Sequence, residues 1–205
     1  MNSTVDIVDA LFGGSARVAI LRVLAVQTIS LTGRQVAELA GVSQPGAARA
    51  LEHFAELGIV SRRRVGRAIL HELERENAMV QSIILPVFEA ERALQERLRH
   101  DLVEAFGAEA LSVVLFGSVA RGDRELPGDI DVLVVVGDTA AADLILERAD
   151  EVAPVFFRRY GMPLSVVVAE QSALPAEPAA FLKSACEEGL VVSGEPLQAL
   201  MPRAC

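Results

Sequence analysis

Two aspartates stand where an apolar strand begins, and this pair limits what the chain can fold into more than any other feature. The stretch from Leu115 to Val136 reads LFGSVARGDRELPGDIDVLVVV. Residues two apart in a strand project from one face, so the carboxylates of Asp129 and Asp131 are expected to lie close together. Two like charges repel each other there unless a cation lies between them. The pair therefore predicts a site for Mg²⁺ or Mn²⁺, which prefer hard oxygen ligands.

The segment ahead of the acids favours a phosphate ligand. Gly117 lets the backbone approach a bound molecule, and Ser118 offers a hydroxyl and an N–H at the start of a short helical turn. Exposed N–H groups of this kind hold phosphate oxygens, and Arg121 reaches the same phosphates. The alternative is that ELPGD is simply a turn and its acids are caps. The Gly-Ser-Val-Ala-Arg-Gly segment argues against that alternative.

Length and composition bound the class of protein. A chain of 205 residues can form one large domain or two small ones. Its longest apolar runs, such as LSVVLFG, have strand length and fall short of the ~20 residues that span a bilayer. The opening MNSTVDIVDALFGG lacks the features of a signal peptide, and two cysteines make no disulfide framework. We therefore expect a cytoplasmic protein with no membrane partner.

Charge is divided unevenly along the chain. Residues 1–77 hold nine arginines and eight acids, whereas residues 78–205 hold ten basic residues and twenty acids. The first part thus has a net charge of +1 and the second of −10, which together give the −9 of the chain. Such asymmetry indicates two units with different partners.

The first unit has the pattern of a helix-turn-helix. Apolar residues at helical spacing predict a helix over 15–26. Thr32 and Gln35 form a capping box for a second helix that ends near Gly41, and Ser43 caps a third helix with Pro45 in its first turn. His53 and His71 are expected at the surface or at a sheet edge, without a metal.

An arginine-rich hairpin follows these helices. Residues 59–73 predict two strands around the Val65-Gly66 turn, and the chain over about 12–75 resembles the winged-helix family of DNA-binding domains. The resemblance implies that the third helix enters a major groove of double-stranded DNA while the hairpin contacts phosphates. The alternatives are a protein-interaction module and a merely solvated tip. The residues expected at DNA are Gln44, Arg49, Arg62, Arg63, Arg64 and Arg67.

The rest of the chain predicts a connector and an α/β domain. One amphipathic helix over 86–107 packs on a domain or forms a dimer seam, the latter implying a homodimer. Strands are expected at 110–117, 129–136, 162–169 and, weakly, 189–194. Helices are expected at 139–159, interrupted near Pro154, and at about 178–188. The fold class is mixed, α+β or α/β, with domains at 1–77 (winged helix), 78–107 (connector) and 108–205.

The segment FGSVARGDRELPGDIDVLVV resembles the nucleotidyltransferase superfamily that includes polymerase beta, most closely its minimal branch. The resemblance covers residues 109–195 and implies a mixed sheet with flanking helices. It assigns Asp129 and Asp131 to two Mg²⁺ ions, and Gly117 and Ser118 to the phosphates of a nucleoside triphosphate. It also implies a third carboxylate on a later strand, where this chain has Ser165. Glu170, farther along, serves as that base only if a bulge reorients it.

Three functions remain open on the sequence. Winged helices joined to such domains resemble bacterial and archaeal regulators and antitoxin-like proteins. The first is a DNA-binding regulator that binds Mg-nucleotide, and the second is an antitoxin that binds a cognate toxin. The third is an enzyme that transfers a nucleoside monophosphate, with AMP as the first choice, to a hydroxyl of a protein or small molecule. The acidic second part argues against a nucleic-acid substrate there.

Overall fold

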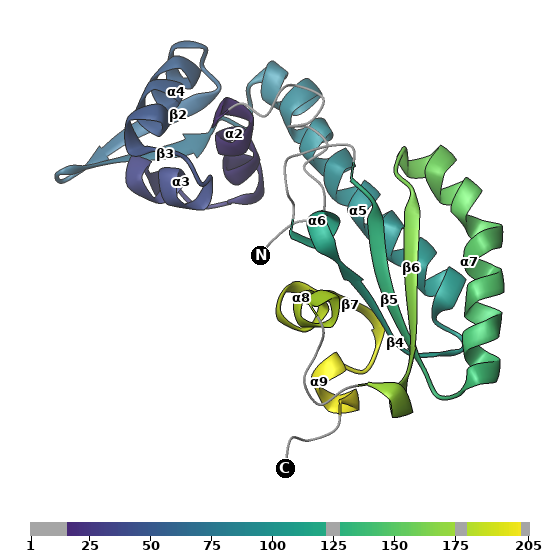
Figure 1. Cartoon of the computed structure of the whole chain (residues 1–205). Coiled ribbons are helices and arrows are strands. Elements are labelled where there is room, and N and C mark those ends of the chain that lie inside the picture. Colours follow the sequence, from purple (N-terminus) through teal and green to yellow (C-terminus); the bar gives the residue numbers. More distant parts are fainter. Residues whose placement is uncertain (1–15, 122–127, 175–179, 202–205) are drawn as a thin grey trace. The chain divides into compact units, whose positions relative to one another are not determined.

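The computed structural model of the chain describes residues 16–121, 128–174 and 180–201 (Figure 1). The chain divides into two compact units, and the division falls between Ala93 and Leu94. This point lies inside helix α5, Leu85–Phe106, which contributes residues to both units. Each unit has its own apolar core. The domain boundaries after residues 77 and 107 stay a prediction.

Among the described residues, the first unit begins with three helices: α2 (Ala16–Val26), α3 (Gly33–Leu39) and α4 (Gln44–Glu56). The Thr32 hydroxyl accepts the N–H of Gln35, whose side-chain oxygen accepts the N–H of Thr32 at 2.9 Å. The Ser43 hydroxyl accepts the N–H of Gly46 at 3.2 Å and caps α4. The predicted capping box and cap are confirmed, because each satisfies N–H groups that have no helical partner.

A three-stranded antiparallel sheet completes this unit, with strand order β1-β3-β2. Strand β2 (Val60–Val65) and strand β3 (Ala68–Leu73) form the predicted hairpin. Its turn contains Gly66 at φ +60°, a left-handed conformation that favours glycine. Strand β1 (Leu31–Thr32) pairs with β3 and was not predicted, because two residues are too few to show a period. Three helices and this hairpin make a winged helix.

The start of α5 is tied to the first unit. Arg22 donates two hydrogen bonds to the Glu91 carboxylate, at 2.8 and 3.1 Å, and its guanidinium lies over the Phe88 ring. A π-helical turn, Val80–Ile84, leads into α5. In it the Leu85 N–H bonds to the Val80 carbonyl, five residues back. Because Pro86 has no N–H, the ordinary helical ladder cannot run through this point.

The second unit is built on a four-stranded mixed sheet in the order β6-β5-β4-β7. Strands β5 (Ile130–Val136) and β6 (Leu164–Glu170) are parallel. Strands β4 (Ala110–Phe116) and β7 (Leu190–Gly194) join the sheet antiparallel. All four strands were predicted from their apolar runs, and the mixed α and β fold class is confirmed.

Helices cover both faces of this sheet. On one face α8 (Ala180–Glu188) and α9 (Leu197–Leu200) share a core with Val167 and Ala169 of β6. On the other face α7 (Thr139–Tyr160) packs along β6 and β5 (Figure 1). Within the described residues, no helix combines the length and the apolarity that crossing a bilayer requires.

Helix α7 corrects one prediction. It runs without interruption from Thr139 to Tyr160, with Pro154 in its interior. The predicted break was wrong. Pro154 and Asp150 are both exposed, so water can satisfy the Asp150 carbonyl, which lacks a helical donor. Its ends follow ordinary capping: Asp138 accepts the Ala141 N–H, and Gly161 stands at φ +70°.

A polar contact joins α7 to α5. The Tyr160 hydroxyl donates to the Asp101 carboxylate at 2.5 Å, and the Arg159 guanidinium donates to the same oxygen. Burial disfavours the charged form of Asp101, but the hydrogen bonds from Tyr160 and Arg159 outweigh it, and the pKa of Asp101 is lowered. The same hydrogen bond and burial raise the pKa of Tyr160.

Candidate functional site

The two predicted acids lie at the start of β5 and share one face of the sheet. Asp129 precedes the strand and is exposed, whereas Asp131, its second residue, is half-buried. Ile130 between them is fully buried, so the carboxylates lie on the opposite side of the backbone from that side chain. Asp131 is paired with Phe116 of β4 and with Ser165 of β6.

Gly117 makes room for the Asp131 carboxylate. It joins β4 to the short helix α6 (Gly117–Arg121) at φ +75°. A Cβ at this position would lie 2.2 Å from Oδ2 of Asp131. Only glycine therefore permits this close approach of carboxylate and backbone. Ser118 follows half-buried, and the side chain of Arg121 lies outside what the structure describes.

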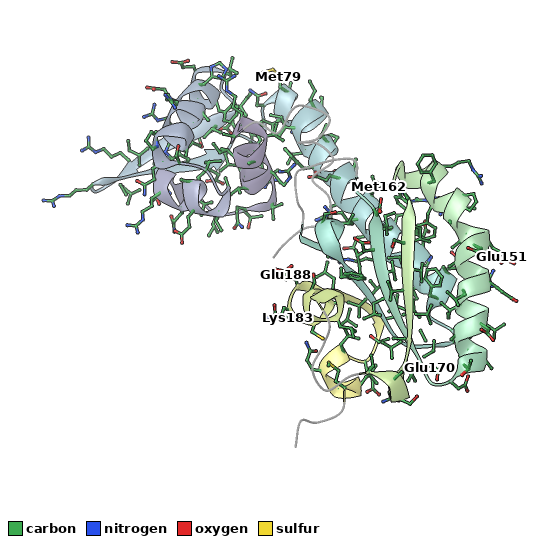
Figure 2. All side chains as sticks on the ribbon, in the orientation of Figure 1. Met79, Glu151, Met162, Glu170, Lys183 and Glu188 are labelled. Carbon is green, nitrogen blue, oxygen red and sulfur yellow. The ribbon has the colours of Figure 1, made fainter. Side chains whose placement is uncertain are left out.

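The structure does not bring Glu170 to the two acids. Ser165 is the residue of β6 beside Asp131, whereas Glu170 is beside Val136, five residues or roughly 16 Å along the strand. The Thr139 hydroxyl of α7 donates to the Glu170 carboxylate at 2.9 Å, on the face away from α8 and α9. Figure 2 shows Glu170 at one end of β6, with Met162 beyond the other end. No bulge reorients the strand, whose register with β5 is unbroken.

The donor set at Asp129 and Asp131 suits a hard divalent cation. Among the described residues, no three His, Cys, Asp or Glu side chains gather closely enough to hold a metal by themselves. Mg²⁺ commonly takes one or two carboxylates and completes its shell with water and substrate phosphates. The two aspartates fit that kind of site.

The predicted DNA-contacting residues of α4 lie on its solvent side. The helix buries Ala47, Ala50, Leu51 and Phe54 in the core of its unit. Gln44 and Arg49 are exposed on the opposite side, near the capped N-terminus. They are thus accessible to a molecule that lies against the helix.

The hairpin arginines are also exposed. Arg62, Arg63 and Arg64 stand in β2, and Arg67 follows the turn. The Arg64 Nε–H donates to the Gly66 carbonyl at 3.3 Å, which braces the turn. Four positive charges therefore project from a narrow β-ribbon.

His71 corrects a second prediction. It is 7% exposed and lies in β3, the central strand of its sheet, opposite Arg62. Its Nδ1 is buried without a hydrogen-bond partner. Burial, together with the nearby Arg62 charge, lowers the pKa of His71. The sequence did carry the signal, because His71 stands two residues before the buried Leu73 and shares its face of the strand.

Residues 95–172 match the model of the family described as "Nucleotidyltransferase domain". This range contains the Gly-Ser pair, both aspartates and Ser165, and it runs from α5 to the end of the strand that carries Ser165. The family model thus covers the start of β5, where the two aspartates lie. No curated protein shows a significant match to the chain.

Several solved structures are similar to parts of the chain. Transcriptional regulator PA3341 is 27% identical over 47% of this chain and 68% of its own, with a TM-score of 0.36. The zinc-responsive MarR family member ZitR of Lactococcus lactis is 21% identical over 45% of this chain and 62% of its own, with a TM-score of 0.34. The adhesin competence repressor AdcR of Streptococcus pyogenes is 16% identical over 49% and 77%, with a TM-score of 0.36.

The architecture follows from the topology of the first unit and from the family match over residues 95–172. The helices α2 to α4 and the hairpin have the topology of a winged helix in their own right. The chain therefore joins a winged helix to a nucleotidyltransferase domain at residues 95–172.

Proposed function

We propose that this protein is a DNA-binding transcriptional regulator whose C-terminal domain binds a nucleoside triphosphate together with Mg²⁺ or Mn²⁺. The observation that carries the proposal is the Asp131 carboxylate held against Gly117, where any other residue would collide with it. Only glycine adopts this conformation without strain and leaves the space that the carboxylate occupies. A phosphate group bound there would meet backbone N–H groups beside two carboxylates.

Each residue has a distinct task in this proposal. Asp129 and Asp131 hold the cation, which would neutralise the charge of the triphosphate when bound. The N–H groups of Gly117 and Ser118 hold phosphate oxygens, and Arg121 supplies a further positive charge. The nucleotide then binds at the start of β5, in a part of the chain whose net negative charge favours an anion that brings its own cation.

The residue beside Asp131 favours binding without transfer. Transfer to an acceptor hydroxyl is assisted by a base within hydrogen-bond reach of the reacting proton. Ser165 occupies the neighbouring position on β6, and its hydroxyl is far too weak a base at neutral pH. Glu170 is about 16 Å away on the other face. We therefore propose that the nucleotide is a ligand of a sensor domain.

The winged helix supplies the DNA-binding part of the proposal. Residues 32–70 carry six arginines and three glutamates, which gives this segment a positive charge in an acidic protein. Gln44 and Arg49 lie at the N-terminal end of α4, where base edges are read, and the hairpin arginines reach phosphates. Phosphate contacts release counterions, so binding should weaken steeply with salt.

DNA binding is tested with the wild type and two variants. Replacing Arg62, Arg63 and Arg64 by Ala should lower affinity for DNA of any sequence and reduce the slope of log K against log salt by up to about 3. Replacing Gln44 and Arg49 by Ala should instead reduce the preference for a selected site. Exposed Arg148 and Arg158 of α7, replaced by Ala, serve as the matched control. If the hairpin variant binds as tightly as the wild type, the hairpin has no role at DNA.

The family match favours a second candidate, an enzyme that transfers a nucleoside monophosphate, with AMP as the first choice, to a hydroxyl of a protein or small molecule. It is tested by label transfer from α-labelled triphosphates with Mg²⁺ or Mn²⁺ and host lysate. Label that appears with the wild type and disappears in the Asp129→Asn, Asp131→Asn variant would establish the enzyme. Label that appears only after Ser165→Asp would support the sensor.

A further inference from the structure

The strand beside the two aspartates presents a neutral side chain to their site. Ser165 of β6 is the register partner of Asp131 in β5, and paired residues of adjacent parallel strands project from the same face of the sheet. That face is the one covered by α8 and α9, because Leu133 of β5 and Val167 of β6, each two residues later, belong to the core beneath those helices. The Ser165 hydroxyl and the Asp131 carboxylate therefore lie side by side, on strands about 4.8 Å apart.

The carboxylate that β6 does carry is held elsewhere. Glu170 is five residues from Ser165, so it points to the opposite face, where it accepts the hydrogen bond from Thr139. In the part of the chain that the structure describes, no third His, Cys, Asp or Glu gathers with Asp129 and Asp131 into a metal-binding group. The described residues therefore offer a cation two negative charges and, beside them, one neutral hydroxyl.

The charge of these ligands decides how many cations they can hold. Two divalent cations in one site lie about 3.5–4 Å apart and repel each other strongly, and carboxylates around them offset the repulsion. A serine hydroxyl offers lone pairs but no negative charge. A single Mg²⁺, by contrast, is commonly held by one or two carboxylates while substrate phosphates and water complete its shell. Two aspartates beside a serine match the single cation.

We propose that Ser165 limits the site to one divalent cation for each bound nucleotide, and that the nucleotide brings this cation with it. Because the same two aspartates and the same ligand are involved, the proposal rests on the function proposed above. The ligand is then the one-to-one complex of a nucleoside triphosphate with Mg²⁺. The two Mg²⁺ ions that the superfamily resemblance implies would need an acid at position 165.

The dependence of nucleotide affinity on free Mg²⁺ counts the cations taken up beyond the one that the nucleotide carries. The probe is ATP, with GTP, CTP and UTP tested beside it, each fully converted to its one-to-one magnesium complex. The wild type should keep the same affinity when free Mg²⁺ is raised tenfold at constant ionic strength. Ser165→Asp should take up a second cation, so its affinity should rise by up to ~10-fold over the same range.

Two matched variants separate charge at this position from size and from charge elsewhere. Ser165→Asn has the size of the Asp variant without its charge, and Ser172→Asp adds the same charge at an exposed serine just beyond the other end of β6. The affinity of both should stay independent of free Mg²⁺, as in the wild type. Circular dichroism would show that the variants keep the fold of the wild type.

Electron paramagnetic resonance with Mn²⁺ in place of Mg²⁺ gives a direct count, one ion per bound nucleotide in the wild type and two in Ser165→Asp. If Ser165→Asp does not fold, the count in the wild type decides alone. A wild type that takes up two ions would overturn this proposal and leave the proposed function standing, whereas a wild type that binds none of the four nucleotides would overturn both. If folded Ser165→Asp binds nucleotide with one ion, residue 165 does not set the number of cations.

Discussion

At the residue scale, the contact between Gly117 and Asp131 links the fold to the proposed ligand. Two observations each require glycine at position 117. Its φ is positive, and a Cβ there would lie 2.2 Å from Asp131 Oδ2. A side chain here must displace either the carboxylate or the start of α6. Both movements alter the place where phosphate and cation would meet.

We expect Gly117→Ala to weaken nucleotide binding at least ~10-fold and to destabilise the domain by about 1–3 kcal/mol. Isothermal titration with Mg-nucleotide and chemical denaturation would measure the two effects. Gly137→Ala is the matched control, since a Cβ there meets nothing within 4 Å. Unchanged binding by Gly117→Ala would remove this glycine from the site.

A second residue, His71, predicts how the stability of the winged helix depends on pH. Its pKa is lowered in the folded state by burial and by Arg62, so the folded form holds the neutral ring. The corresponding stability is complete above the unfolded pKa of about 6.5 and is lost as the pH falls through the lower, folded value. The denaturant concentration at the midpoint of unfolding should therefore decrease as the pH is lowered from about 7.5 to about 5.5.

Substitution of His71 isolates this effect. His71→Leu should flatten the pH dependence, whereas His53→Gln, in a more exposed position, should leave it as in the wild type. If the wild type and His71→Leu lose stability in parallel over this pH range, another group is responsible.

At the scale of elements, sequence signals predicted the segments that carry their own boundary chemistry. Thr32, Gln35 and Ser43 act within one turn, so their caps could be derived without the rest of the fold. Strand β1 could not, because its two residues are held only by pairing with β3. The prediction of a break at Pro154 was wrong because it also needed the rest of the fold. Whether water reaches the unpaired Asp150 carbonyl depends on which side of α7 packs on the sheet.

The proline inside α7 offers a prediction at this scale. Pro154→Ala should restore a helical hydrogen bond and raise the free energy of unfolding by roughly 1–3 kcal/mol. Pro45→Ala is the control, because Pro45 lies in the first turn of α4, where no helical bond is lost. Urea denaturation of both variants measures the difference. If both variants change the free energy of unfolding equally, Pro154 does not destabilise α7.

At the scale of the whole molecule, the candidate site could be predicted in part. Spacing alone predicted that Asp129 and Asp131 share one face, because strand periodicity is local. Ser165 was expected beside them only from the resemblance to the nucleotidyltransferase superfamily, and the pairing of β6 with β5 puts it there. The collision that reserves position 117 for glycine could not be predicted, since it depends on the pairing of β4 with β5. The burial of His71 likewise depends on pairing, here of β3 with β1 and β2, and its neighbours in sequence indicated it only weakly.

The charge division suits the two proposed ligands. In the proposed function, the hairpin arginines contact a polyanion, and the acidic second unit binds an anion together with a cation. Loss of DNA binding and loss of nucleotide binding should therefore be separable by substitution, the first in the hairpin and the second at the aspartates.

The most direct measurement is equilibrium binding of nucleoside triphosphates to the full chain, with and without Mg²⁺, beside the Asp129→Asn, Asp131→Asn variant. The account predicts binding that requires the cation and falls at least ~100-fold in the variant, because both carboxylate ligands are lost. Binding that needs no cation, or that survives in the variant, would contradict it.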